Sequence, residues 1–204
     1  MWLEREFGYR EDFMTDEVMK GLLEEQSSMG LVQSVLGGEF RAKNTQYLRN
    51  EYVHGTPDIV LRKEDVIEDV KTSFNLRTFT DSDLAKNYWW QGQGYMWLTG
   101  KTHYRLIYCL VKTPDNLVAN EKRRWFYKFD QDEYNPHFLA ACEQIEKNND
   151  LIDQIPKTSR IKIFEFDFDP EKIELLKTKI EASREYYKTL ALPVFVGKDK
   201  QLTV

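Results

Sequence analysis

Residues 55–73, with the sequence GTPDIVLRKEDVIEDVKTS, decide how this chain folds. The segments 57–61 and 66–71 are short and rich in β-branched residues, so each predicts a β-strand. The charged residues between them predict a turn. In a hairpin centred on that turn, opposed positions have numbers that sum to 127. Asp58 is therefore expected to face Asp69, with their β-carbons about 4.5–5.5 Å apart.

Lys71 lies two positions after Asp69, and side chains alternate along a strand, so its amine is expected on the same face. Two carboxylates and an ammonium then converge beside Val60 and Ile67. Carboxylates this close repel each other, and a divalent cation is the natural compensation. Oxygen ligands suit Mg²⁺ or Mn²⁺. The alternative is a pair of turn and edge-strand charges with Lys71 as their salt-bridge partner.

A helix capped by residue 81 or 82 is expected to follow and to end near Gly100. Gln91 and Tyr95 lie four positions apart, so they share one face of this helix. An amide and a phenol on that face can orient Lys71 or hold a phosphate.

Two glycines, Gly92 and Gly94, interrupt the same helix. Each costs about 1 kcal/mol relative to alanine, so they indicate close approach of the hairpin or of a nucleic-acid backbone. The aromatic residues around them are expected to pack in the core. Tyr95 is exempted, with Tyr88 as an outside candidate.

These motifs resemble the signature of the PD-(D/E)XK nuclease superfamily. Asp58 after Gly-Thr-Pro and the triplet DVK at 69–71 are similar to its acidic pair and lysine. The segment QGQGY at 91–95 resembles the Gln-x-x-x-Tyr motif of the branch that includes RecB-type and phage lambda-type exonucleases. The resemblance covers about residues 15–112 and implies an α/β, restriction-endonuclease-like core, a mixed β-sheet flanked by helices.

The resemblance also implies an activity, that of a Mg²⁺- or Mn²⁺-dependent DNA nuclease. It points to an exonuclease of phage or recombination type whose hydrolysis leaves a 5′-phosphate. The implied metal ligands are Glu25, Asp58, Asp69 and the Val70 carbonyl. The implied catalytic residues are Asp58, Asp69, Lys71, Gln91 and Tyr95, with Lys71 assisting the attacking water. The residues expected to bind substrate are Thr72, Ser73, Gln91 and Tyr95.

The resemblance also implies an acidic ligand upstream of the two strands. Members of the family carry an acid or a histidine on the helix before the strands, often four residues after a glycine. Gly21 places Glu25 at that spacing, with Glu24 next in line. The alternative is an exposed pair of glutamates on an amphipathic helix.

Basic residues on both sides of the site are candidates for phosphate contacts, and each has the alternative of an ordinary solvated charge. They are Arg41, Lys43, Arg49, Lys101, Arg105 and the run Lys122-Arg123-Arg124. The run beside Trp125 is the best candidate, because cations and aromatic rings together favour nucleic acid.

Composition sets the outer limits. The 204 residues include 41% hydrophobic and 31% charged residues, which excludes intrinsic disorder. The net charge of −5 argues against coating of nucleic acid or membrane by bulk charge. Cys109 and Cys142 lie in apolar stretches and cannot build a cysteine-held cluster. No leader or run of about 18 apolar residues is present, so a cytoplasmic protein is expected.

The rest of the chain alternates between helical and extended patterns. An acidic helix is expected from Thr15 or Asp16 toward Gly30. Extended segments are expected at 45–54, 103–112 and 160–167, and helices at 136–147 and from Pro170 to about Leu190. We expect a single nuclease domain over 1–204, with a core at about 15–170 and a C-terminal helix and tail at 170–204.

Two other functions stay open. One is a non-catalytic nuclease fold that binds DNA or a partner protein, and the other is a site-specific endonuclease. A homo-oligomer or a recombination partner is also expected, since the apolar stretch 192–196 can join a subunit interface or fold back on its own domain.

Overall fold

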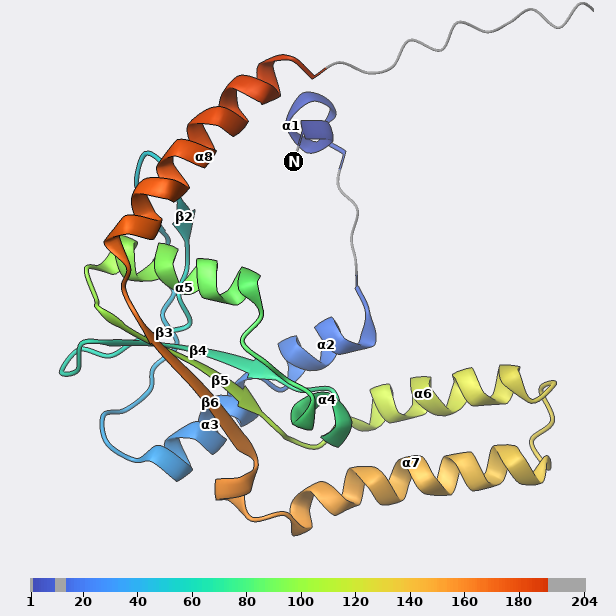
Figure 1. The fold of residues 1–204 in the computed structure, drawn as a ribbon. Coiled ribbons are helices and arrows are strands. Elements are labelled where there is room, and N and C mark those ends of the chain that lie inside the picture. Colours follow the sequence, from blue (N-terminus) through green and yellow to red (C-terminus); the bar gives the residue numbers. More distant parts are fainter. Residues whose placement is uncertain (1, 10–13, 191–204) are drawn as a thin grey trace, which may run out of the picture. The chain divides into compact units, whose positions relative to one another are not determined.

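A computed structural model describes residues 2–9 and 14–190 (Figure 1). Of these, 14–169 form one compact unit, and 2–9 with 170–190 form another. The larger unit nearly coincides with the core expected at about 15–170, while the number of domains stays a prediction. The apolar stretch 192–196 lies outside the described residues.

The larger unit contains a four-stranded sheet and its helices. In chain order its elements are α2 (Asp16–Leu23), α3 (Glu25–Leu36), β1 (Leu48–Arg49), β2 (His54–Gly55), β3 (Ile59–Val60), β4 (Val66–Thr72), α4 (Leu76–Thr80), α5 (Lys86–Thr99), β5 (His103–Cys109), α6 (Asp115–Lys128), α7 (Pro136–Gln154), the 3-10 helix η1 (Lys157–Ser159) and β6 (Ile161–Asp167). The smaller unit contains α1 (Trp2–Phe7) and α8 (Pro170–Lys188), and Tyr187 of α8 donates a hydrogen bond to Glu6 of α1.

The sheet is mixed, as expected. Its strand order is β3-β4-β5-β6; β4 and β5 are parallel, whereas β3 and β6 run antiparallel to their neighbours. Between β3 and β4, Ile59 pairs with Glu68 and Val60 pairs with Ile67. Both pairs have the predicted sum of 127, so the register of the hairpin is confirmed.

The two faces of the sheet pack against different helices (Figure 1). One face buries Val66, Val70 and Ile107 against Val32 of α3. The other face buries Ile67, Tyr104 and Leu106 against Met96 of α5. Because side chains alternate along β4, Asp69 projects with Ile67 toward α5.

The predicted N-terminal helix is two helices. Thr15 caps α2 as expected, with its hydroxyl accepting a hydrogen bond from Val18 N. The helix ends at Leu23, and Glu24 adopts φ −103° and ψ 11°, outside the helical region, before α3 begins. Lys20 on α2 is fully buried and donates hydrogen bonds to the carbonyls of Phe74 and Val111, which ties α2 to the ends of β4 and β5.

Three other boundaries differ from the sequence-based expectation. The expected cap at residue 81 or 82 is wrong, because Asn75 starts the short α4 with a capping box and Ala85 precedes α5; Gly100 is the C-cap of α5, near the expected end. The segment 45–54 contributes only β1 and the first residue of β2. The arm formed by α6 and α7 was expected only in part, since α6 was not predicted and α7 extends to Gln154.

Candidate active site

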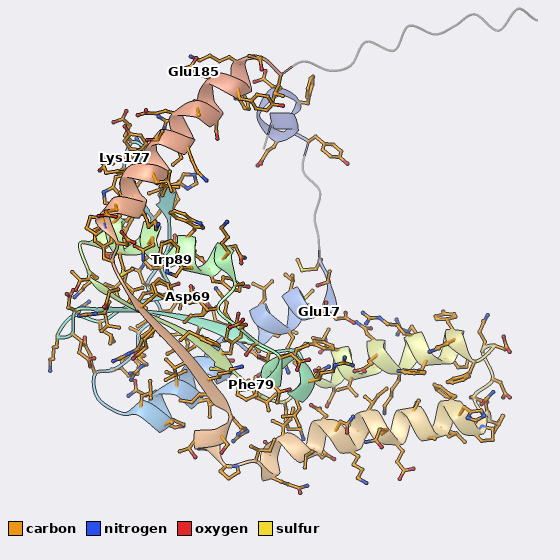
Figure 2. All side chains as sticks on the ribbon, viewed as in Figure 1. Glu17, Asp69, Phe79, Trp89, Lys177 and Glu185 are labelled. Atoms are coloured by element: carbon orange, nitrogen blue, oxygen red, sulfur yellow. The ribbon has the colours of Figure 1, made fainter. Side chains whose placement is uncertain are left out.

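Asp58 and Asp69 meet on the α5 face of the hairpin, as the register predicts. Asp58 directly precedes β3, and its Oδ2 accepts a hydrogen bond from Val70 N at 3.1 Å. Lys71 Nζ lies 2.6 Å from Asp69 Oδ2. In Figure 2, Asp69 lies between the sheet and α5. The structure therefore brings together the two carboxylates and the amine that the sequence singled out.

Burial and charge set the protonation of these groups. Asp69 is 1% exposed, and burial raises its pKa to about 7; Lys71 lowers that pKa, and the Asp58 carboxylate raises it. Burial lowers the pKa of Lys71, but the two carboxylates outweigh burial and the pKa is raised above its ordinary value. Lys71 is therefore an ammonium at neutral pH. It can donate hydrogen bonds.

Gln91 and Tyr95 form a pair on α5. Gln91 Nε2 donates a hydrogen bond to the Tyr95 hydroxyl at 3.1 Å. Among the described residues neither side chain hydrogen-bonds Lys71, whose Nζ instead lies 5.2 Å from the ring centroid of Tyr88. Gln91 and Tyr95 therefore do not orient Lys71 by direct contact. The aromatic ring beside the Lys71 amine is that of Tyr88.

Gly92 allows α5 to lie close to the sheet. A β-carbon at this position would be 2.5 Å from Phe166 Cζ and 3.0 Å from Tyr104 Cδ1. The close approach expected from this glycine is thus made to β5 and β6 rather than to the hairpin. At Gly94 an added β-carbon would meet nothing within 4 Å, so that glycine has no packing role.

The upstream acid stays a prediction. Glu25 is the first residue of α3 and forms an ion pair with Lys43. Glu24 lies at the junction of α2 and α3. Among residues 2–9 and 14–190, no three side chains of histidine, cysteine, aspartate or glutamate are grouped closely enough to hold a metal ion. The structure therefore does not join Glu25 to Asp58 and Asp69.

The carboxylates fit a hard divalent cation without a third acidic side chain. Asp69 Oδ2 is buried and accepts no hydrogen bond of normal geometry, although Lys71 lies beside it. Mg²⁺ keeps several waters and is commonly bound through one or two carboxylates together with substrate phosphates. Asp58 and Asp69 supply two such carboxylates, and the Val70 carbonyl stays a predicted ligand.

Comparison with known proteins identifies solved structures that are similar to this chain. The sequence matches no family model and no curated protein. The crystal structure of a phage related exonuclease from Haemophilus somnus 129PT is similar, with a TM-score of 0.71 and 26% identity over 92% of this chain and 77% of that chain. An alkaline exonuclease from Laribacter hongkongensis has a TM-score of 0.58 and 12% identity, over 92% of this chain and 75% of that chain. Its complex with dAMP gives the same values.

This chain has the PD-(D/E)XK nuclease fold. The fold explains why an acidic pair and a lysine occupy one hairpin, with the Gln-x-x-x-Tyr pair on the helix above it. It also confirms the fold class and the resemblance expected from residues 55–95.

Within this PD-(D/E)XK site, the two hydroxyls after Lys71 differ. Thr72 Oγ1 lies 2.8 Å from Ser28 Oγ, so the hydroxyl is engaged on the α3 side of the sheet. Ser73 Oγ is buried and has no hydrogen-bond partner, while Ser73 N continues the ladder to Cys109 O. Of these two hydroxyls, only that of Ser73 makes no hydrogen bond with the described residues, and its oxygen is buried.

Most of the predicted phosphate-binding cations are engaged within the chain. Arg41 is buried, and its Nε and Nη2 donate to Glu68 at 2.6 and 3.1 Å. Glu68 is fully buried and also contacts Arg105. The expectation that Arg41 meets phosphate is thus wrong, because Arg41 compensates an internal carboxylate.

The remaining cations divide into two groups. Those with a partner are Lys43 with Glu25, Lys101 with the Glu64 carbonyl, Arg105 with Glu68 and Glu165, Lys122 with Glu146, and Arg124 with Asp16. Arg49 and Arg123 make no ion pair among the described residues and stay candidates for phosphate contacts.

Sequence reasoning missed Tyr104. This residue lies on β5, pairs with Ile67 of β4 and is 0% exposed. Its hydroxyl makes no hydrogen bond within the part of the chain that the structure describes, and burial and the carboxylates of Asp69 and Asp58 raise its pKa far above the ordinary value. The feature of the sequence that could have indicated this residue is a tyrosine hydroxyl within a segment predicted to be a buried strand. Its position beside Asp69 depends on the parallel pairing of β4 and β5, which the sequence does not specify.

Proposed function

We propose that this protein is a Mg²⁺- or Mn²⁺-dependent DNA nuclease that hydrolyses phosphodiester bonds as an exonuclease. The observation that carries the proposal is the convergence of Asp58, Asp69 and Lys71 on one face, below the pair Gln91 and Tyr95. The similarity to two exonucleases supports the same activity.

Asp58, Asp69 and the Val70 carbonyl would hold the cation, with Glu25 as a further ligand. When bound, the cation would neutralise the two carboxylates and withdraw electron density from a phosphate oxygen. The protein's share of this task is to keep the carboxylates together. Val70 N does so by donating to Asp58, and the pairing of β3 with β4 fixes the register.

Lys71 acts as a cation. Its ammonium would donate hydrogen bonds to the phosphate oxygens as negative charge develops on them, and would help to hold the attacking water. The amine is three-quarters buried, so the interaction takes place where water screens it little.

Tyr95 and Ser73 would contact the DNA strand. Gln91 donates its hydrogen bond to the Tyr95 oxygen, so the phenolic proton of Tyr95 is free to bind a phosphate oxygen. Ser73 carries a buried hydroxyl without a partner directly after the catalytic strand. Thr72 acts differently from the expectation, since its hydroxyl joins β4 to Ser28 of α3.

Degradation of end-labelled linear DNA and of closed circular DNA, with Mg²⁺ or with EDTA, tests this function. The proposal predicts loss of linear DNA only, and only with Mg²⁺. Cleavage of the circle would favour a site-specific endonuclease. An inactive protein that still binds DNA would favour a non-catalytic module.

We propose the cytoplasm, where such DNA is available, as the site of action. We also propose that the protein forms a homo-oligomer or binds a recombination partner.

A further inference from the structure

The hydroxyl of Tyr104 is a buried polar group that makes no hydrogen bond with the described residues. Tyr104 is 0% exposed, and its oxygen has no hydrogen-bond partner. Its ring is closely packed, with the centroid of Phe166 at 4.9 Å and Gly92 directly above. A phenylalanine would fill this space equally well without burying an unpaired hydroxyl, so packing does not account for the phenol.

The neighbours of that hydroxyl are parts of the proposed active site. Tyr104 pairs with Ile67, and Asp69 follows two residues later on the same face of β4. Tyr104 and Asp69 therefore lie on the same face of two neighbouring strands, two positions apart in the register. A neutral phenol donates a hydrogen bond, and a carboxylate on that face accepts one.

Asp69 needs such a donor. The carboxylate is 1% exposed, so bulk water cannot orient it, and its Oδ2 accepts no hydrogen bond of normal geometry although Lys71 Nζ lies 2.6 Å away. Ligating carboxylates are usually oriented by a hydrogen bond from a second residue. Tyr104 is the buried donor that lies beside Asp69 without another partner.

We propose that Tyr104 is a positioning residue that donates a hydrogen bond to Asp69 and orients this carboxylate for a divalent cation. The inference rests on the proposed function of the Asp58 and Asp69 site. Tyr104 does not contact substrate in this account, and it acts only through Asp69.

Tyr108 offers a matched control. It lies on the same strand and the same face, four residues after Tyr104. Its hydroxyl donates a hydrogen bond to the Asp83 carbonyl at 3.1 Å and is therefore already used in the fold. Removal of the Tyr108 hydroxyl should destabilise the protein without changing the affinity for the cation. Removal of the Tyr104 hydroxyl should weaken cation binding without destabilising the protein.

Calorimetric titration of the full chain with Mn²⁺ tests the proposal. We expect Tyr104→Phe to weaken Mn²⁺ binding by about tenfold or more. Its melting temperature in EDTA should change little, because the proposed hydrogen bond to Asp69 forms when that carboxylate holds the cation. In the nuclease assay, the Mg²⁺ concentration for half-maximal rate should rise while the rate at saturating Mg²⁺ falls less. Tyr108→Phe should keep the wild-type Mn²⁺ affinity and melt at a lower temperature.

A second pair of variants separates the possible failures. Tyr104→Met fills the site without a hydroxyl and should weaken Mn²⁺ binding as Tyr104→Phe does. Wild-type Mn²⁺ affinity in a folded Tyr104→Phe or Tyr104→Met would overturn the role of Tyr104. Asp58→Asn should abolish Mn²⁺ binding; if it does not, the proposed metal site itself is wrong, whatever the Tyr104 variants do.

Discussion

Gly55 and Tyr95 are in direct contact, although they lie on different elements of the PD-(D/E)XK fold. A β-carbon at Gly55 would lie 2.6 Å from Tyr95 Cε1 and 3.3 Å from the Tyr95 hydroxyl oxygen. The first residue of the GTPD motif is therefore a glycine because the phenol of the helix motif rests on it. The two motifs are packed against each other.

Gly55→Ala should therefore displace Tyr95. We expect a loss of nuclease activity of about tenfold to a hundredfold, because small displacements of positioning groups have large effects on rate. The free energy of unfolding should fall by about 1–3 kcal/mol through overpacking. Gly30→Ala is the control, since an added β-carbon there meets nothing within 4 Å. Equal activity of Gly55→Ala and Gly30→Ala would contradict this contact.

The two glycines inside α5 should respond in opposite ways. Gly92→Ala places a β-carbon 2.5 Å from Phe166, so it should lower the free energy of unfolding by about 1–3 kcal/mol. Gly94→Ala meets open space and should raise it by up to about 1 kcal/mol through better helix propensity. Denaturant unfolding of the two variants measures both changes. A loss of stability in Gly94→Ala equal to that in Gly92→Ala would show that neither reflects packing.

The high pKa of Asp69 predicts that stability falls as pH rises. The folded pKa is about 7, mainly through burial, whereas an unfolded aspartate titrates near 4. The protonated acid thus adds stability that is fully present below pH ~4 and is lost as pH rises through ~7. Measured in EDTA, wild type should lose on the order of 2–4 kcal/mol relative to Asp69→Asn over this range. A difference that is constant from pH 4 to pH 8 would contradict the assignment.

Arg41 should matter for folding and not for DNA. Arg41→Ala leaves the buried Glu68 with only Arg105, and we expect a loss of about 3 kcal/mol in the free energy of unfolding. The double variant with Glu68→Leu should recover part of this loss, since no buried charge is then left unpaired. Arg49→Ala should stay within about 0.5 kcal/mol of wild type. If Arg41→Ala is as stable as wild type, the buried ion pair between Arg41 and Glu68 does not stabilise the fold.

The sequence predicted the parts of this molecule that depend on local pattern. A charged turn between two β-branched segments was sufficient for the register of β3 and β4, and hence for the meeting of Asp58 and Asp69. Spacing along one helix was sufficient to pair Gln91 with Tyr95. In each case the residues are separated by few positions, and period and turn chemistry determine their contact.

Contacts between distant segments could not be predicted in this way. Glu68 follows the pattern of a solvent-facing residue, and only its pairing with Arg41, which lies 27 positions away, makes burial possible. Tyr104 reaches Asp69 because β4 and β5 are parallel, with α5 as the crossover between them. The break at Glu24 leaves no mark in the amphipathic pattern of residues 15–30. Tertiary packing decides all three.

Release of end label from linear DNA by Asp58→Ala and Lys71→Ala, with Mg²⁺ present, tests the central claim most directly. Folding is verified by thermal unfolding, and Lys147→Ala, an exposed lysine on α7, is the matched control. The account predicts that both site variants stay folded and lose activity by at least about a hundredfold, while the control keeps the wild-type rate. Wild-type label release by either folded site variant would contradict it.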